Sequence, residues 1–210
     1  MTEPLTLTFA EIEFVLAARP QQAAEVRRDL RIEPDQDVRS LARAGLASLL
    51  ARKLCEPAND TPEGAQDVVP GPEITAVAAA FSTSRTHTVA AGWRGKQSNV
   101  MHLYSGDSLR LAVFPYQYGR YAVEALNPAE PLSGPLSRFL DAHLADGLES
   151  AFIVKSTTAG AEPVSMAVAV DASGGWSASD SWRNPDHAEP VSRDRVLPRL
   201  TELFDQQPNG

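Results

Sequence analysis

Apolar and polar residues alternate through the middle of the chain, from Thr86 to Leu126. Segments with a period of two are separated by short connections rich in Gly, Pro, Ser and Asp, which is the pattern of β-strands joined by hairpin turns. We therefore predict an antiparallel meander with strands at Thr86–Arg94, Gln97–Tyr104, Ser108–Phe114 and Arg120–Leu126. A half-buried sheet has one apolar face, and the residues expected to share a face are Val89, Ala91 and Trp93 on the first strand and Leu109, Leu111 and Val113 on the third.

Helical periodicity precedes these strands. Thr8 and Glu11 have the spacing of a capping box, and Leu7 and Ile12 occupy the positions of a hydrophobic staple. A first helix should therefore begin after Thr8 and end near Pro20. A short second helix is expected at Gln21–Leu30.

A third helix is predicted after Asp37, whose side chain can cap it. Its apolar residues recur at helical spacing, so one face should belong to the core. The residues of this stripe are Val38, Leu41, Leu46, Leu49, Leu50 and Leu54.

The segment 55–72 interrupts the helical pattern. It contains four prolines and two glycines together with acidic residues, and it is predicted to be a flexible loop. The alanine-rich segment Glu73–Phe81 that follows predicts a short helix able to pack closely against another element.

The remaining sequence repeats the order of strands followed by a helix. A helix at Gly134–Asp146, with Gly147 as its C-terminal cap, presents the stripe Leu136, Phe139, Leu140, His143 and Leu144. Three more strands are expected at Ala151–Ser156, Val164–Val170 and Gly175–Asp180. A terminal helix, with Pro198 in its first turn, presents Val196, Leu197, Leu200, Leu203 and Phe204.

The order of elements predicts the fold class. We expect an α+β protein in which an antiparallel sheet meander forms two quasi-repeated halves, with helices packed on one face. The chain 1–210 would be a single domain, with an N-terminal half at 1–147 and a C-terminal half at 148–210.

Composition and charge limit the classes of partner and the location that we expect for the protein. Hydrophobic residues make up 43% and charged residues 22%, which indicates a globular chain large enough to bury a core without a cofactor. Nineteen basic and 27 acidic residues give a net charge of −8, which disfavours nucleic acid and anionic membranes as partners. Cys55 is the single cysteine, and neither a leader pattern nor an apolar run long enough to span a bilayer is present, so we expect a cytoplasmic protein.

One short motif suggests catalysis. Residues 106–109 read Gly-Asp-Ser-Leu, the nucleophile block of the GDSL hydrolases, but the partner motif Asp-x-x-His is missing, because Asn184 stands where the acid should precede His187. A Gly-Asp hairpin turn explains the same four residues. The four histidines lack metal-ligand spacing, and His143 is expected to be a hydrogen-bonded core residue. We predict no catalytic, cofactor or metal site.

Aromatic residues are the best candidates for a partner-binding site. Large rigid rings anchor protein interfaces because they bury much area at little entropic cost. Two candidates flank the turn after the third strand of the meander, Tyr116 and Tyr118, and two bracket the last strand, Trp176 and Trp182. The alternative is that these rings cover the core of their own sheet.

The order of elements resembles the EspG family, the cytoplasmic chaperones of actinobacterial type VII secretion. The segments that carry the resemblance are 46–52 (LASLLAR), 88–93 (TVAAGW), 108–113 (SLRLAV) and the closing helix 196–204. The resemblance implies that the protein binds a helical heterodimer of PE-PPE type and covers an aggregation-prone apolar tip until secretion. It assigns no individual residue.

We therefore expect a non-enzymatic chaperone or adaptor for a helical client, whose capture should weaken in Trp182→Ala. Two rival hypotheses stay open. The first is a small serine hydrolase centred on Ser108, which predicts ester turnover that is lost in Ser108→Ala. The second is a homodimeric structural module, which predicts a dimer in solution and no client.

Overall fold

The computed structural model describes residues 5–18, 20–32, 37–58, 68–144, 148–181 and 188–205. The chain divides into two compact units: unit 1 is Met1–Ser84 with Ser105–Ala125, and unit 2 is Arg85–Tyr104 with Leu126–Gly210. These units are composed differently from the halves 1–147 and 148–210, whose quasi-repeat stays a prediction. The α+β class with antiparallel strands is confirmed.

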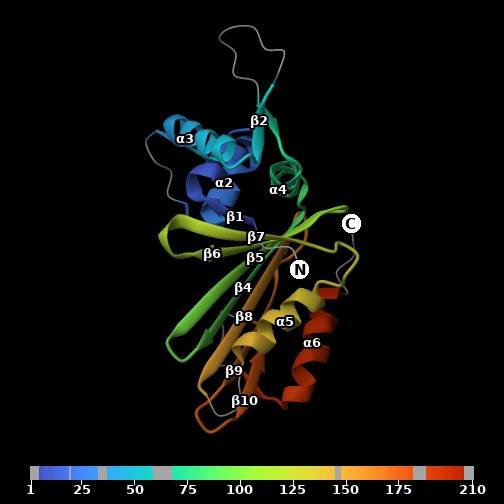
Figure 1. Ribbon diagram of the computed structural model, residues 1–210. Helices are drawn as coiled ribbons and strands as arrows, with labels where there is room; N and C mark the ends of the chain where they lie inside the picture. Colours follow the sequence, from blue (N-terminus) through green and yellow to red (C-terminus); the bar gives the residue numbers. More distant parts are fainter. Residues whose placement is uncertain are drawn as a thin grey trace. The chain divides into compact units, whose positions relative to one another are not determined.

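In the described part of the chain, unit 1 combines four helices with a two-stranded sheet, described below, and with three strands that pair with one another (Figure 1). The strands are β1 (Leu5–Thr8), β6 (Arg110–Tyr116) and β7 (Arg120–Leu126), in the order β1-β7-β6. The short 3-10 turn η1 (Gln117–Gly119) joins β6 to β7. The helices are α1 (Phe9–Ala17), α2 (Pro20–Asp29), α3 (Val38–Ala51) and α4 (Pro72–Thr83).

The beginning of α1 confirms the sequence analysis. The Thr8 side chain accepts a hydrogen bond from Glu11 N at 3.3 Å, and the Glu11 carboxylate accepts one from Thr8 N at 2.8 Å. This is the capping box, which satisfies two amide groups that the helix leaves unpaired. Both staple residues, Leu7 and Ile12, are fully buried.

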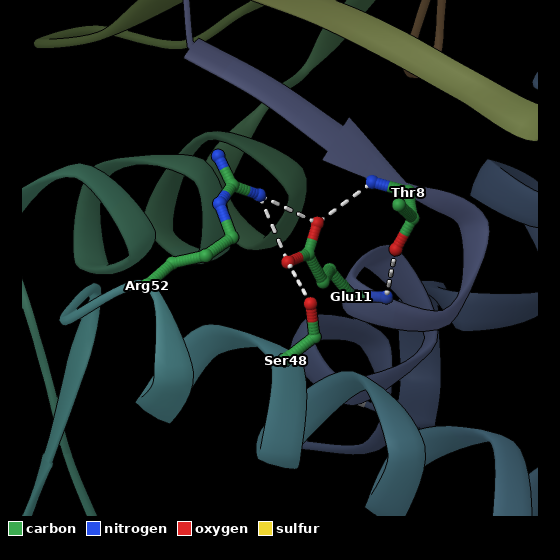
Figure 2. A network of polar contacts seen from close by, with 4 residues as sticks. All are labelled: Thr8, Glu11, Ser48 and Arg52. Carbon is green, nitrogen blue, oxygen red and sulfur yellow. Dashed lines mark hydrogen bonds and ion pairs between the residues drawn. The ribbon is translucent and has the colours of Figure 1, made fainter.

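Two buried carboxylates of α1 hold the neighbouring helices. Glu11 receives Arg52, the C-cap residue of α3, and also the Ser48 hydroxyl, as Figure 2 shows. Glu13 receives two hydrogen bonds from Arg27 of α2, at 2.7 and 2.6 Å. Because a buried charge without a partner is costly, these pairs fix how α2 and α3 pack on α1.

The buried face of α3 matches the predicted leucine stripe only at Leu49. Asp37 caps the helix as expected, but the buried residues are Ala42, Gly45 and Leu49. A Cβ atom at Gly45 would lie 2.0 Å from the carbonyl oxygen of Ala10, so α3 approaches the α1 backbone more closely than any side chain allows. Close helix packing therefore selects the small residues, and several of the leucines stay half-exposed.

The predicted loop 55–72 is structured at both ends. β2 (Cys55–Pro57) and β3 (Val68–Pro70) pair antiparallel, with Glu56 opposite Val69. The loop prediction is wrong for these two segments, because proline is tolerated in a strand where its missing N–H faces away from the partner. Residues 59–67 lie outside the described residues. Cys55 is buried, and burial raises the pKa of its thiol, in line with an inert cysteine.

Unit 2 is a sheet with two helices on one face (Figure 1). Its strands follow the order β5-β4-β8-β9-β10-β11. Their bounds are β4 (Thr86–Arg94), β5 (Gln97–Ser105), β8 (Ser150–Thr158), β9 (Val164–Val170), β10 (Trp176–Ser179) and β11 (Glu189–Pro190). α5 (Ser133–His143) packs on β4 and β8, and α6 (Arg193–Asp205) packs on β9 and on α5.

The buried face of β4 is the one opposite to the predicted apolar face. Thr88, Ala90 and Gly92 are buried, whereas Trp93 is exposed. Gly92 explains why this face of β4 is buried, because a Cβ atom at Gly92 would lie 2.4 Å from the His143 ring of α5. The helix therefore packs on the residues that leave it room.

His143 is a hydrogen-bonded core residue, as predicted. Its Nδ1 lies 2.7 Å from the carbonyl oxygen of Phe139, and its Nε2 lies 2.9 Å from the Asn99 amide nitrogen. A carbonyl only accepts, so Nδ1 carries the proton and Nε2 accepts from Asn99. The ring thereby links α5 to β5.

Two predicted helix ends need correction. α5 ends at His143 with Leu144 as its C-cap, and Gly147 lies outside the described residues. Pro198 lies beyond the first turn of α6, because the helix already begins at Arg193. The stripe of α6 is confirmed at Val196, Leu200 and Phe204, which are buried, whereas Leu197 is exposed.

Candidate protein-binding surfaces

Unit 2 has an open groove of about 640 Å³, which we call the Trp93 groove. It is lined by residues of β4, β8, β9, β10 and β11 and of the segments that flank these strands. Trp93 lies at one side of the lining, and Ala188 and Pro190 lie at the other.

The strand register explains the floor of the groove. Trp93 pairs with Ala151, Ala151 with Ala169, Ala169 with Ser177, and Ser177 with Pro190. Residues paired in this way lie on the same face of a sheet. Because Gly92, one residue before Trp93, faces α5, this row lies on the face opposite to the described helices of unit 2. Small side chains therefore form the floor between an indole ring and a proline.

The next row on the same face carries two carboxylates. Gly95 N donates to the Glu149 carbonyl at 3.2 Å, and Asp171 N donates to the Gly175 carbonyl at 2.9 Å, so the pairing continues past the strand ends. Glu149 and Asp171 therefore share the face of Ala151 and Ala169, and both line the groove.

Trp176 also lines the Trp93 groove, but its position in the strand register differs from that of Trp93. It pairs with Val170, which pairs with Ser150, so strand alternation places its side chain on the face that the helices cover. The guanidinium carbon of Arg193 lies 5.9 Å from the centre of the Trp176 ring. The ring is half-exposed, and its predicted role in partner binding stays a prediction. Trp182 lies outside the described residues.

The other two predicted residues lie at a hairpin tip of unit 1. Tyr116 is 59% exposed and Tyr118 is 87% exposed, and Phe9 is exposed as well. A Cβ atom at Gly119 would lie 2.9 Å from the Phe9 ring, so Phe9 belongs to the same tip. Tyr118 has φ of 63° and Gly119 has φ of 64°, a left-handed conformation that a tyrosine adopts only at a cost.

The neighbouring aromatic Tyr121 belongs to the core. It is buried, its hydroxyl donates to the Leu30 carbonyl at 3.3 Å, and burial raises its pKa. This structural tyrosine on β7 thus differs from the exposed pair, which lies at the end of β6 and in the turn η1.

Sequence reasoning missed Trp93 as a surface residue. The alternation groups Trp93 with Val89 and Ala91 on one face, and the grouping is correct, but this face is not the one that α5 covers. The available signal was Gly92, since a glycine in a strand interior marks a close approach by another element.

The Ser108 motif forms an exposed turn among the described residues. Gly106 N donates to the Leu109 carbonyl at 2.9 Å and closes a turn, and Ser108 is exposed. Within the described ranges, no hydrogen bond links its hydroxyl to a base. His187 lies outside these ranges. Among the described residues no group of three or more His, Cys, Asp or Glu side chains could hold a metal ion.

No helix among the described residues is long and apolar enough to cross a lipid bilayer. No protein-family model matches the sequence, and no curated protein matches it either.

The fold is similar to that of a solved structure, the Mycobacterium tuberculosis type VII secretion system chaperone EspG5 in complex with the PE25-PPE41 dimer. The match has a TM-score of 0.63, covers 99% of this chain and 98% of that chain, and has 12% sequence identity. The likeness therefore concerns the fold of the whole chain.

Proposed function

We propose that this protein is a non-enzymatic, cytoplasmic chaperone or adaptor that binds a helical client of PE-PPE type for type VII secretion. The observation that carries the proposal is the fold shared over the whole chain with a chaperone that was solved with its PE-PPE dimer. The low identity leaves the client of this chain to be found by experiment.

The Trp93 groove supports a helical client. Its floor crosses from β4 to β11, which are four strand spacings apart, so the row from Trp93 to Pro190 measures about 19 Å. A helix of about 13 residues has the same length. Alanine and serine in the floor allow a helix to approach closely, and Trp93, 39% exposed, offers a rigid ring that loses little entropy on binding.

The experiment is co-expression of the full chain with each PE-PPE type pair of the genome that encodes it. Size-exclusion chromatography with light scattering then measures the mass of any complex. We expect one pair to co-elute with the chain in a complex of one copy of each protein. The proposal would be overturned if every pair eluted apart from the chain, and a dimer of the chain alone would then favour the homodimeric module.

A further inference from the structure

The two carboxylates of the Trp93 groove lie opposite each other on neighbouring strands. Continuing the register of β8 and β9 by one residue pairs Glu149 with Asp171. Directly opposed residues on antiparallel strands have Cα atoms about 5 Å apart. Two negative charges so placed repel each other, which costs stability unless a positive charge lies between them.

No basic side chain lines the groove in the described part of the chain. Arg94 pairs with Ser150, and strand alternation therefore directs it to the opposite face. Arg193 lies over the Trp176 ring, which belongs to that opposite face as well. Within the described residues, the groove thus combines an indole and a small-residue floor with two carboxylates and no basic lining residue.

The Asp171 carboxylate is held in place. One of its oxygens accepts hydrogen bonds from Ser173 N at 2.8 Å, from the Ser173 hydroxyl at 2.6 Å and from Gly175 N at 2.9 Å. The Ser173 hydroxyl, followed by the backbone amides of Gly175 and Ser173, lowers the pKa of Asp171 below its ordinary value. These three hydrogen bonds all go to the same oxygen, Oδ1, and a carboxylate oxygen has two lone pairs, so Oδ2 can accept from a partner.

We infer that the client helix that occupies the Trp93 groove carries basic side chains, arginine or lysine, which pair with Glu149 and Asp171. Apolar residues of the same helix cover Trp93 and the alanine floor. This inference rests on the proposed function. It adds a requirement on the client helix: an apolar stripe must lie within about three helical turns of a positively charged side chain. The charge complementarity selects among helices that have similar apolar stripes.

The test uses three synthetic helical peptides and the full chain. Each peptide has 14 residues built from alanine, leucine and glutamine with one apolar stripe, and two positions four residues apart at one end are both Arg, both Gln or both Glu. Fluorescence anisotropy measures the dissociation constants. We expect the Arg peptide to bind about tenfold more tightly than the Gln peptide, since two partly exposed ion pairs give an advantage of this order. The Glu peptide should bind least.

The double variant Glu149→Gln with Asp171→Asn should abolish this preference. Asparagine keeps an oxygen that accepts from Ser173 and Gly175, so the turn is retained. Glu162→Gln, at an exposed acidic residue of unit 2 outside the groove, is the matched control and should leave the preference intact.

The outcomes separate this inference from the proposed function. Equal binding of the Arg and Gln peptides, or an Arg preference that survives the double variant, would overturn the inference and leave a helix-binding groove. If none of the three peptides bound the chain, the groove would not take a helix, and both the inference and the role of this surface in the proposed function would fail.

Discussion

The buried Glu11 carboxylate and the Arg52 guanidinium lie 2.9 Å apart, and they join the first helix of unit 1 to the end of the third. Glu11 is fully buried, whereas the Arg52 side chain is partly exposed. The carboxylate also accepts hydrogen bonds from Thr8 N and Ser48 (Figure 2). A single side chain thus caps one helix and anchors another.

We predict that Arg52→Met lowers the free energy of unfolding by about 3 kcal/mol, because it leaves a buried carboxylate without its counter-charge. Urea unfolding followed by circular dichroism measures the change. Arg43→Gln, at an exposed position of the same helix, is the control and should change stability by less than about 0.5 kcal/mol. Equal effects of the two substitutions would contradict the structural role of the pair.

Acid should weaken the folded state through Glu11. Burial raises the pKa of this carboxyl, but hydrogen bonds from Thr8, Ser48 and Arg52 outweigh burial, and the pKa lies below its ordinary value of 4.5. A group with a depressed folded pKa contributes stability above its unfolded pKa, and this contribution is lost as the pH falls through the folded pKa. We predict that below pH 4.5 the stability of Glu11→Gln falls less steeply than that of the wild type.

Urea unfolding at a series of pH values between about 5 and 2 measures both slopes, a range that brackets the titration of carboxyl groups. Glu202→Gln, an exposed residue of α6, is the control and should keep the wild-type slope. A Glu11→Gln slope as steep as the wild-type slope would show that this carboxylate does not carry the acid sensitivity.

Gly45→Ala should destabilise the protein, although alanine is the better helix former. The exchange gains about 1 kcal/mol of helix propensity. The new Cβ atom would lie 2.0 Å from the Ala10 carbonyl oxygen, which is backbone and cannot rotate away. Separating two packed helices costs more than the gain, so we expect a net loss of about 2 kcal/mol in chemical denaturation. The control is Ala47→Gly, at an exposed position of the same helix, which should show the propensity effect alone, a loss of about 1 kcal/mol. A gain in stability for Gly45→Ala would show that α1 and α3 do not approach so closely.

Tyr118→Asn should stabilise the protein. The left-handed backbone of Tyr118 is strained for a tyrosine, and asparagine adopts it more readily. We expect a gain of about 1 kcal/mol in the free energy of unfolding. Tyr116→Ser removes an exposed ring at ordinary backbone angles and should leave stability unchanged within about 0.5 kcal/mol. No gain in Tyr118→Asn would mean that the hairpin tip stores no strain.

Local chemistry made much of the fold predictable. The capping box of Thr8 and Glu11 located α1, and the alternation between Thr86 and Arg94 gave β4 with the observed bounds. These signals are local, because both the hydrogen bonds of a cap and the period of a strand come from residues close in sequence.

The buried face of β4 and the pairing of β2 with β3 depend on tertiary packing, which the local sequence pattern does not show. The apolar residues of β4 pointed to the face of Val89, whereas the fit between Gly92 and His143 buries the other face. The prolines of 55–72 concealed the β2 and β3 pair, since a pairing partner more than ten residues away leaves no periodic signal.

The candidate site depended even more on distant residues. The sequence singles out Tyr116 and Tyr118 as rings beside a turn but leaves open whether they cover the core of their own sheet, and the structure shows both to be exposed. The Trp93 groove, by contrast, exists only because the registers of β8, β9 and β10 bring Ala151, Ala169 and Ser177 into one row. Register is set by the whole sheet, so no single segment predicts it.

The central claim is that a helical client binds across the Trp93 groove. The most direct measurement is the dissociation constant of the co-eluting pair for the wild type, for Trp93→Ala and for Leu197→Ala, by isothermal titration calorimetry. Leu197 is the matched control, because it is 38% exposed in the same unit and Trp93 is 39% exposed. The account predicts that Trp93→Ala weakens binding by about tenfold or more without lowering the melting temperature, and that Leu197→Ala leaves binding unchanged. Unchanged binding in Trp93→Ala would contradict it.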